Sequence, residues 1–180
     1  MVNEQIVPCL VDHFETACVE LFESLKCDVS RIEENEEAVM SIPIACIDAG
    51  SEDLELLLSL RIPISVLSLT YPIQEDIVGM DEVILEDWLS ELSNQLMGKM
   101  KKKLLVYGLD LQTGLPNSYF GTDINELLPD DFETVFLYFD IDHEICSCSI
   151  SVGIFNQEMI FERQAVVSED QTVESELELF

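Results

Sequence analysis

The sequence feature that most constrains the fold is a long amphipathic stretch from Glu82 to about Tyr107. Large apolar side chains recur there at steps of three and four residues, the spacing of one face of an α-helix. This stripe consists of Leu85, Trp88, Leu89, Leu92, Leu96 and Met100. We therefore predict a helix over residues 82–107 that packs its apolar face against a core supplied by the rest of the chain.

The composition allows such a core. The chain has 180 residues, enough for one ordinary domain, and 48% of them are apolar. With 37 acidic and 8 basic residues its net charge is -29, so the acidic side chains must lie on the surface. Such a surface repels nucleic-acid phosphates and anionic lipids, which excludes ordinary DNA or RNA binding and favours basic or metal-bearing partners.

The same composition predicts the domain organisation and the compartment. We expect one domain over residues 1–167, followed by a mobile acidic tail over 168–180 that contains no basic residue. The first five residues lack the features of a signal peptide, and the longest uncharged apolar stretch, 62–73, is much shorter than the roughly 20 residues of a membrane span. We therefore expect a cytoplasmic protein without membrane association.

Cysteine and histidine give no indication of a metal site. The six cysteines lack CxxC pairs and Cys/His zinc spacing, so we interpret them as reduced thiols in the core. Cys146 and Cys148 are expected on one face of a strand, as small apolar side chains. His13 and His143 are expected to have structural or solvent-facing roles, because neither has a second ligand at metal spacing.

The remaining patterns predict an α+β fold of two layers, in which a mostly antiparallel sheet packs against two long helices. Residues 63–69 fit either a strand or a short helix, because β-branched residues favour the first and an initial proline the second. The other expected elements are a helix at 8–26, a connection at 30–37, strands at 38–47 and 54–62, a turn at 48–51, a loop at 71–79, short strands from 109 to 121, a hairpin of 134–141 with 145–155, and an edge strand within 157–167.

Two polar residues stand out on the long helix. Glu91 and Asn94 lie opposite the apolar stripe, three residues apart, so their Cβ atoms are about 5–6 Å from each other. Gly98, one turn beyond Asn94, leaves no side chain to obstruct an approaching partner. A carboxylate and an amide are thus presented together, although such a pair is also common on a solvated helix face.

The surroundings of this pair are more specific. The stretch from Asp87 to Gly98, followed by Gly114-Leu115-Pro116 and Gly121, resembles the CheX/CheC family of chemotaxis phosphatases. In that family a helix carries Glu-x-x-Asn ahead of a glycine, and a later strand region contains Leu-Pro with a glycine a few residues on. The resemblance covers roughly residues 5–165. Because one Glu-x-x-Asn occurs here and not two, the chain is most similar to the CheX-like branch.

The resemblance implies a phosphatase that hydrolyses the phospho-aspartate of a CheY-like response regulator. It implies that Asn94 is the catalytic amide, orienting the attacking water, and that Glu91 is its partner carboxylate, docking on the regulator's lysine. The chain would need no cofactor of its own, since the regulator supplies Mg²⁺, and it would form a homodimer.

The sequence also allows two other functions and two roles for a group of lysines. The fold could be a non-catalytic module that binds a receiver domain or another chemotaxis protein, or an acidic decoy that imitates nucleic acid. Four lysines directly after Gly98 either complement the helix dipole and the local acidity or contribute to docking. They are Lys99, Lys101, Lys102 and Lys103.

Overall fold

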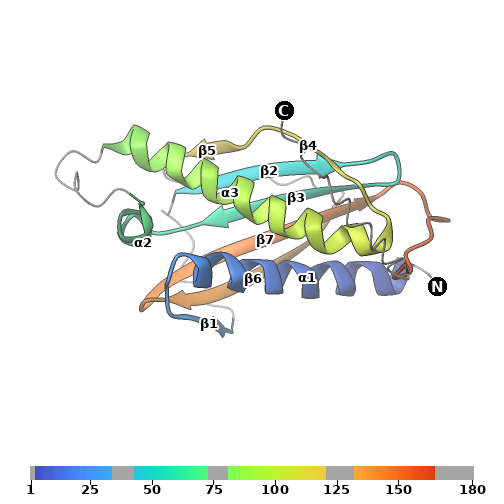
Figure 1. Ribbon diagram of the computed structural model, residues 1–180, viewed down its shortest axis with the longest axis horizontal. Helices are drawn as coiled ribbons and strands as arrows, with labels where there is room; N and C mark the ends of the chain where they lie inside the picture. Colours follow the sequence, from blue (N-terminus) through green and yellow to red (C-terminus); the bar gives the residue numbers. More distant parts are fainter. Residues whose placement is uncertain (1–2, 34–42, 73–80, 121–131, 165–180) are drawn as a thin grey trace, which may run out of the picture.

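Helices cover one face of an antiparallel sheet (Figure 1). The computed structural model describes residues 3–33, 43–72, 81–120 and 132–164. Within them, two long helices lie side by side across a seven-stranded sheet, and a short helix lies near the start of the second one. The predicted α+β fold with two long helices is therefore confirmed. The predicted tail at 168–180 and the loop at 73–79 lie outside the described residues.

The sheet has the strand order β1-β6-β7-β3-β2-β4, and β5 also pairs with β2. Every strand pair is antiparallel. The elements are α1 (Asn3–Ser24), β1 (Val29–Ile32), β2 (Ile44–Gly50), β3 (Leu54–Arg61), α2 (Ile64–Thr70), α3 (Glu82–Leu104), the 3₁₀-helix η3 (Leu105–Tyr107), β4 (Gln112–Thr113), β5 (Asn117–Tyr119), β6 (Glu133–Ile141) and β7 (Glu144–Ile154).

The first helix is longer than predicted, because it begins at Asn3 and contains Pro8. The predicted start at residue 8 rested on the apolar periodicity that begins at Leu10. Ile6 and Val7 are buried, however, and this additional apolar contact stabilises the extra turn.

Two predictions about the early strands are wrong. Residues 29–32 form β1, which pairs with β6, where a connection starting at residue 30 was expected. The expected turn at 48–51 is instead mostly strand, because β2 runs to Gly50 and pairs there with β3 and β4. The chain turns after it, where the Ser51 hydroxyl accepts hydrogen bonds from the backbone of Asp53 and Leu54.

The edge strand expected within 157–167 is also wrong for its described part. Residues 157–164 form no strand. Their backbone instead crosses the C-terminal end of α3, where the Gln164 N–H donates to the carbonyl of Val106 at 2.7 Å. The tight hairpin of β6 and β7, by contrast, is confirmed.

The long helix confirms the predicted stripe. Its six predicted apolar residues are all buried, and the core also contains Met97 and Leu104 from the same helix. The helix starts at a cap, since the Asp81 carboxylate accepts a hydrogen bond from the Ile84 N–H at 3.0 Å. These contacts fix which face of α3 points away from the sheet.

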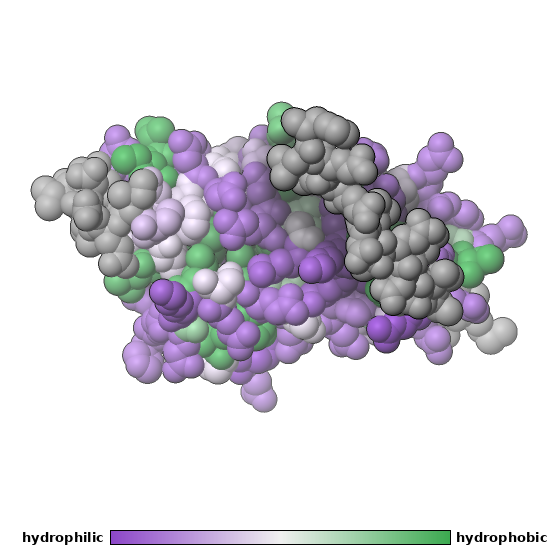
Figure 2. All heavy atoms as spheres, viewed as in Figure 1, coloured by the Kyte–Doolittle hydropathy of each residue, from purple (hydrophilic) through white to green (hydrophobic). Residues whose placement is uncertain are grey.

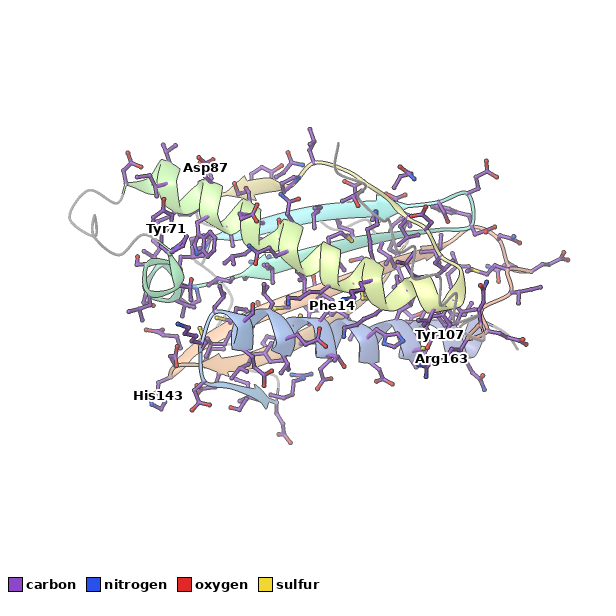
Figure 3. The ribbon with its side chains drawn as sticks, in the orientation of Figure 1. Phe14, Tyr71, Asp87, Tyr107, His143 and Arg163 are labelled. Carbon is purple, nitrogen blue, oxygen red and sulfur yellow. The ribbon has the colours of Figure 1, made fainter. Side chains whose placement is uncertain are left out.

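The ambiguous segment after Pro63 is a helix, α2. Trp88 fixes the position of α2, because its indole N–H donates to the Thr70 hydroxyl at 3.1 Å and its ring meets the ring of Tyr71 edge-on. Tyr71 is labelled beside α2 in Figure 3. Tertiary contact with the first turns of α3 therefore stabilises a short helix that its β-branched residues do not favour.

The cysteines are free thiols, and four are buried: Cys18, Cys46, Cys146 and Cys148. Cys9 and Cys27 are partly buried. Burial raises the pKa of the Cys46 thiol to about 11. These observations confirm the interpretation of reduced core thiols for the four buried residues. None of the described helices is long and apolar enough to cross a membrane.

Candidate functional site

The Glu91–Asn94 pair lies on the outward face of α3. Both side chains are exposed, as is Asp87 one turn earlier, which is labelled near the start of the helix in Figure 3. Hydrophilic side chains dominate the side of the molecule that α1 and α3 cover (Figure 2). The predicted exposure of Glu91 and Asn94 is thus confirmed, and their chemical role stays a prediction.

Glu91 has a neighbour that sequence reasoning missed. The Gln95 amide donates a hydrogen bond to the Glu91 carboxylate at 3.0 Å. The two residues are four apart, Glu91 is exposed and Gln95 is half-buried, so this contact stabilises the helix by only about 0.2–0.5 kcal/mol. The i, i+4 spacing was the signal that could have revealed it. The bond directs Glu91 along the helix surface without burying it.

Strand β5 secures the helix next to Asn94. The Ser90 hydroxyl donates to the Ser118 hydroxyl at 3.0 Å, and Ser93, which is buried, donates to the Ser90 carbonyl at 2.8 Å. These two bonds lie within one turn of Asn94. The amide is therefore carried by a rigid stretch of backbone, as a positioning role requires.

The two glycines of the motif region differ in their surroundings. A Cβ atom added at Gly98 would meet no atom within 4 Å, so nothing in the described structure requires a glycine there. At Gly114 the same atom would overlap the Asp48 carboxylate, and the Gly114 N–H donates to the Asp48 carbonyl at 2.9 Å. A side chain at Gly114 would therefore require the Asp48 carboxylate to move, whereas one at Gly98 would displace no described side chain. Gly121 lies outside the described residues.

The four lysines at the C-terminal end of α3 differ in their contacts. Lys103 binds Glu20 of α1 at 2.6 Å and helps to hold the two helices together. Lys99, Lys101 and Lys102 form no ion pair with any described residue. Lys102 is fully exposed and the other two are half-buried. Three positive charges therefore stay available beyond Gly98 in a chain with a large acidic excess.

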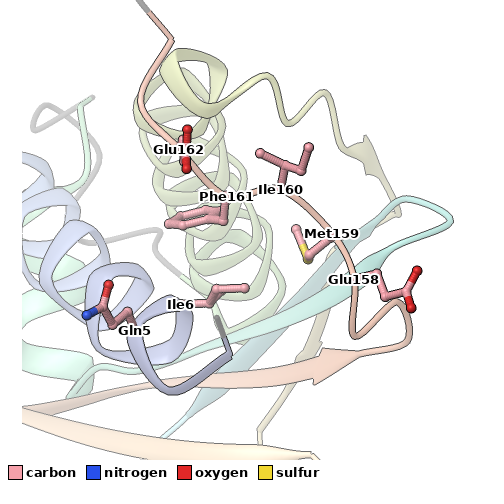
Figure 4. A pocket seen from close by; sticks show the side chains of 7 residues that line it. All are labelled: Gln5, Ile6, Glu158, Met159, Ile160, Phe161 and Glu162. Carbon is pink, nitrogen blue, oxygen red and sulfur yellow. The ribbon is translucent and has the colours of Figure 1, made fainter. Parts of the chain in front are cut away.

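A pocket of about 350 Å³ lies elsewhere, between the start of α1 and residues 158–162 (Figure 4). Because residue 164 is bonded to Val106, this pocket is near the C-terminal end of α3, about 20 Å along the helix from Glu91. It is not part of the Glu91–Asn94 site. Among the described residues no cluster of three or more His, Cys, Asp or Glu side chains could hold a metal ion.

The two histidines have the structural and solvent-facing roles that were predicted. His13 shares a hydrogen bond of 3.0 Å with the Tyr107 hydroxyl, and burial, with a smaller effect from Lys103, lowers its pKa. His143 is exposed in the β6–β7 turn, where its backbone N–H donates to the Asp140 carboxylate at 2.9 Å.

Comparison with solved structures places this arrangement among known folds. CheX from Vibrio vulnificus is 12% identical and superposes with a TM-score of 0.66, covering 80% of this chain and 99% of its own. The fold is that of CheX. The CheX–CheY–BeF3–Mg complex of Borrelia burgdorferi is also similar, at 12% identity and a TM-score of 0.60, covering 79% and 96% of the two chains.

The CheX-type fold extends to other proteins. Chains described as CheC-like match over a similar span. The middle domain of FliM from H. pylori is 7% identical, with a TM-score of 0.50 and coverage of 78% and 84%. No protein-family model and no curated protein sequence matches the chain. These identities establish the fold, and function must be argued from the site.

Proposed function

We propose that this protein is a phosphatase that hydrolyses the phospho-aspartate of a CheY-like response regulator. The observation that supports the proposal is the exposed Glu91–Asn94 pair on the long helix of a CheX-type fold. One structure with this fold is a complex of CheX with CheY, BeF3 and Mg.

The chemistry suits an amide. A receiver domain brings its own Mg²⁺, lysine and hydroxyl to the phosphoryl group, so most of the charge stabilisation belongs to the substrate. What a partner can add is a water molecule held in line with the phosphorus. The Asn94 amide both donates and accepts hydrogen bonds, so it can hold that water through the loose transition state without first removing its proton.

Glu91 contributes recognition in this mechanism. Its carboxylate would form a charge-assisted contact with the lysine of the receiver domain and so set the register in which Asn94 enters. To do so it exchanges its hydrogen bond with Gln95 for the stronger contact to the lysine. Glu91 binds and orients, while Asn94 acts on the reaction itself.

The shape of the site also favours a protein substrate. Glu91 and Asn94 project from a helix, and the described pocket lies about 20 Å away along α3. A small phosphate ester would need a concave site on the enzyme. A phosphorylated receiver carries its phosphoryl group in a pocket of its own, which an exposed helix can enter.

The two residues can be tested separately. Asn94→Ala is expected to lose most of the accelerated dephosphorylation at saturating protein, while the Kd for the receiver stays within about threefold. Glu91→Ala is expected to raise KM by about tenfold or more, because it removes a charged hydrogen bond. Glu82→Ala, which removes an exposed acidic residue in the first turn of α3 and outside the motif stretch, is the matched control. Full turnover in Asn94→Ala would disprove the mechanism.

A second candidate is a non-catalytic module that binds a receiver domain or another chemotaxis protein. The similarity to the FliM middle domain favours this reading, because it shows that the fold is not confined to CheX. Tight receiver binding with no acceleration by the unaltered protein would select it.

A further inference from the structure

We infer that Leu115 is an apolar anchor that docks on the receiver domain beside its phosphoryl site. This inference rests on the proposed function and extends it from the Glu91–Asn94 pair to the neighbouring loop between β4 and β5. The loop contains an apolar side chain that belongs to no buried cluster of the described residues.

Leu115 is unusually exposed for a leucine. Its relative exposure is 82%, the highest among the exposed large apolar residues of the described chain. An isolated exposed leucine on a mobile loop would need no explanation. The backbone that carries this one is constrained, and an apolar side chain on a constrained backbone is suited to binding, because less conformational entropy is lost when a partner covers it.

Four local constraints hold the loop. The Gly114 N–H donates to the Asp48 carbonyl at 2.9 Å, and the Asn117 amide donates to the Leu115 carbonyl at 3.2 Å. Pro116 restricts the backbone of Leu115 to extended conformations. Both flanking strands, β4 and β5, pair with β2. The side chain is therefore presented outward from a backbone with little freedom.

The position of Leu115 along α3 can be worked out from the Ser90–Ser118 hydrogen bond, which joins the helix to β5. The two elements run in opposite directions (Figure 1). Leu115 precedes Ser118 by three residues, about 10 Å of strand. Asn94 and Gly98 follow Ser90 by four and eight residues, about 6 and 12 Å of helix. Leu115 thus lies at a level between Asn94 and Gly98.

Gly98 leaves an open surface at this level of α3. A Cβ atom added there would meet no described atom within 4 Å outside its own helix backbone. A domain that receives Asn94 in its phosphoryl pocket would rest there on Gly98 and cover Leu115. The partner therefore needs an apolar side chain on the rim of an acidic, Mg²⁺-binding pocket.

The test compares Leu115→Ala with Ile160→Ala. Ile160 is also aliphatic and 80% exposed, but lies beside the pocket near the end of α3. Dephosphorylation of a receiver from the same organism is followed over a range of protein concentrations, with Mg²⁺ present. Leu115→Ala is expected to raise KM about tenfold at unchanged kcat, since covering a leucine contributes enough for that factor. Ile160→Ala should leave both constants unchanged.

The outcomes separate this inference from the proposed function. An unchanged KM in Leu115→Ala, or an equal rise in Ile160→Ala, overturns the anchor while acceleration by the unaltered protein still supports the phosphatase. Absence of both binding and acceleration by the unaltered protein overturns both. Unchanged Tm in Leu115→Ala shows that the variant is folded.

Discussion

The hydrogen bond between Gln95 and Glu91 allows a prediction whose size follows from its geometry. Gln95→Ala removes a donor that lies 3.0 Å from the Glu91 carboxylate, on an exposed face and one helical turn away. Such i, i+4 contacts stabilise a helix by about 0.2–0.5 kcal/mol. Glu91 must release Gln95 to reach a receiver lysine, so the variant should bind the receiver at most about twofold more tightly.

Glu91→Gln provides the contrast. It retains the size of the side chain but removes the charge, and a hydrogen bond between charged groups contributes about 1.5–3 kcal/mol. The expected loss of affinity is therefore about ten- to a hundredfold. A small effect of Gln95→Ala and a large effect of Glu91→Gln would show that Glu91 binds the receiver and that Gln95 does not.

The assay is the Kd of the receiver domain, activated with Mg²⁺ and beryllium fluoride, measured by fluorescence anisotropy for both variants. Gln5→Ala, an exposed glutamine on α1, is the control for removing a helical glutamine. A change of tenfold or more in the Kd of Gln95→Ala would contradict this weak role of Gln95. It would mean either that Gln95 orients Glu91 for binding or that Gln95 competes strongly with the receiver for the Glu91 carboxylate.

Three further predictions concern charge, backbone and assembly. The double variant Lys101→Gln, Lys102→Gln should slow association with the receiver several-fold and weaken the salt dependence of the association rate in stopped-flow measurements. The charge-matched control, Lys26→Gln with Arg163→Gln, should change the association rate little. Equal effects of the two double variants would leave the lysines only the role of complementing the helix dipole. Gly98→Ala should raise the free energy of unfolding in urea by about 0.5–1 kcal/mol, because alanine is the better helix former and its Cβ displaces nothing. Gly114→Ala should lower the same free energy by less than about 1 kcal/mol, because its Cβ displaces the end of the Asp48 side chain. The same sign in both variants would contradict the packing. The homodimer stays a prediction, checked by light scattering on gel filtration at micromolar concentration, where a monomer would count against it.

The sequence predicts elements well where periodicity is sustained. The stripe on α3 covers several turns, and the β6–β7 hairpin alternates over long strands, so both were recognised. Strand β1 has four residues, none of them buried, and forms only because β6 pairs with it from the far end of the chain. Such non-local pairing leaves no local signal.

In the candidate site, too, local patterns could be predicted from the sequence and non-local contacts could not. A helical wheel is enough to predict that Glu91 and Asn94 share the exposed face, because the stripe fixes the rotation of α3. The fixed loop at Leu115 depends on Gly114 meeting Asp48, two residues far apart in sequence. Composition had suggested a turn at Asp48, so the support of that loop could be found only from the structure.

Removal of phosphate from a receiver domain through Asn94 can be measured directly. The decay of each phosphorylated receiver of the same organism is followed, with Mg²⁺, in buffer alone, with this protein and with Asn94→Ala. We expect one or more receivers to lose phosphate at least tenfold faster with the unaltered protein and at the buffer rate with the variant. Decay at the buffer rate for every receiver, or equal acceleration by Asn94→Ala, would contradict this expectation.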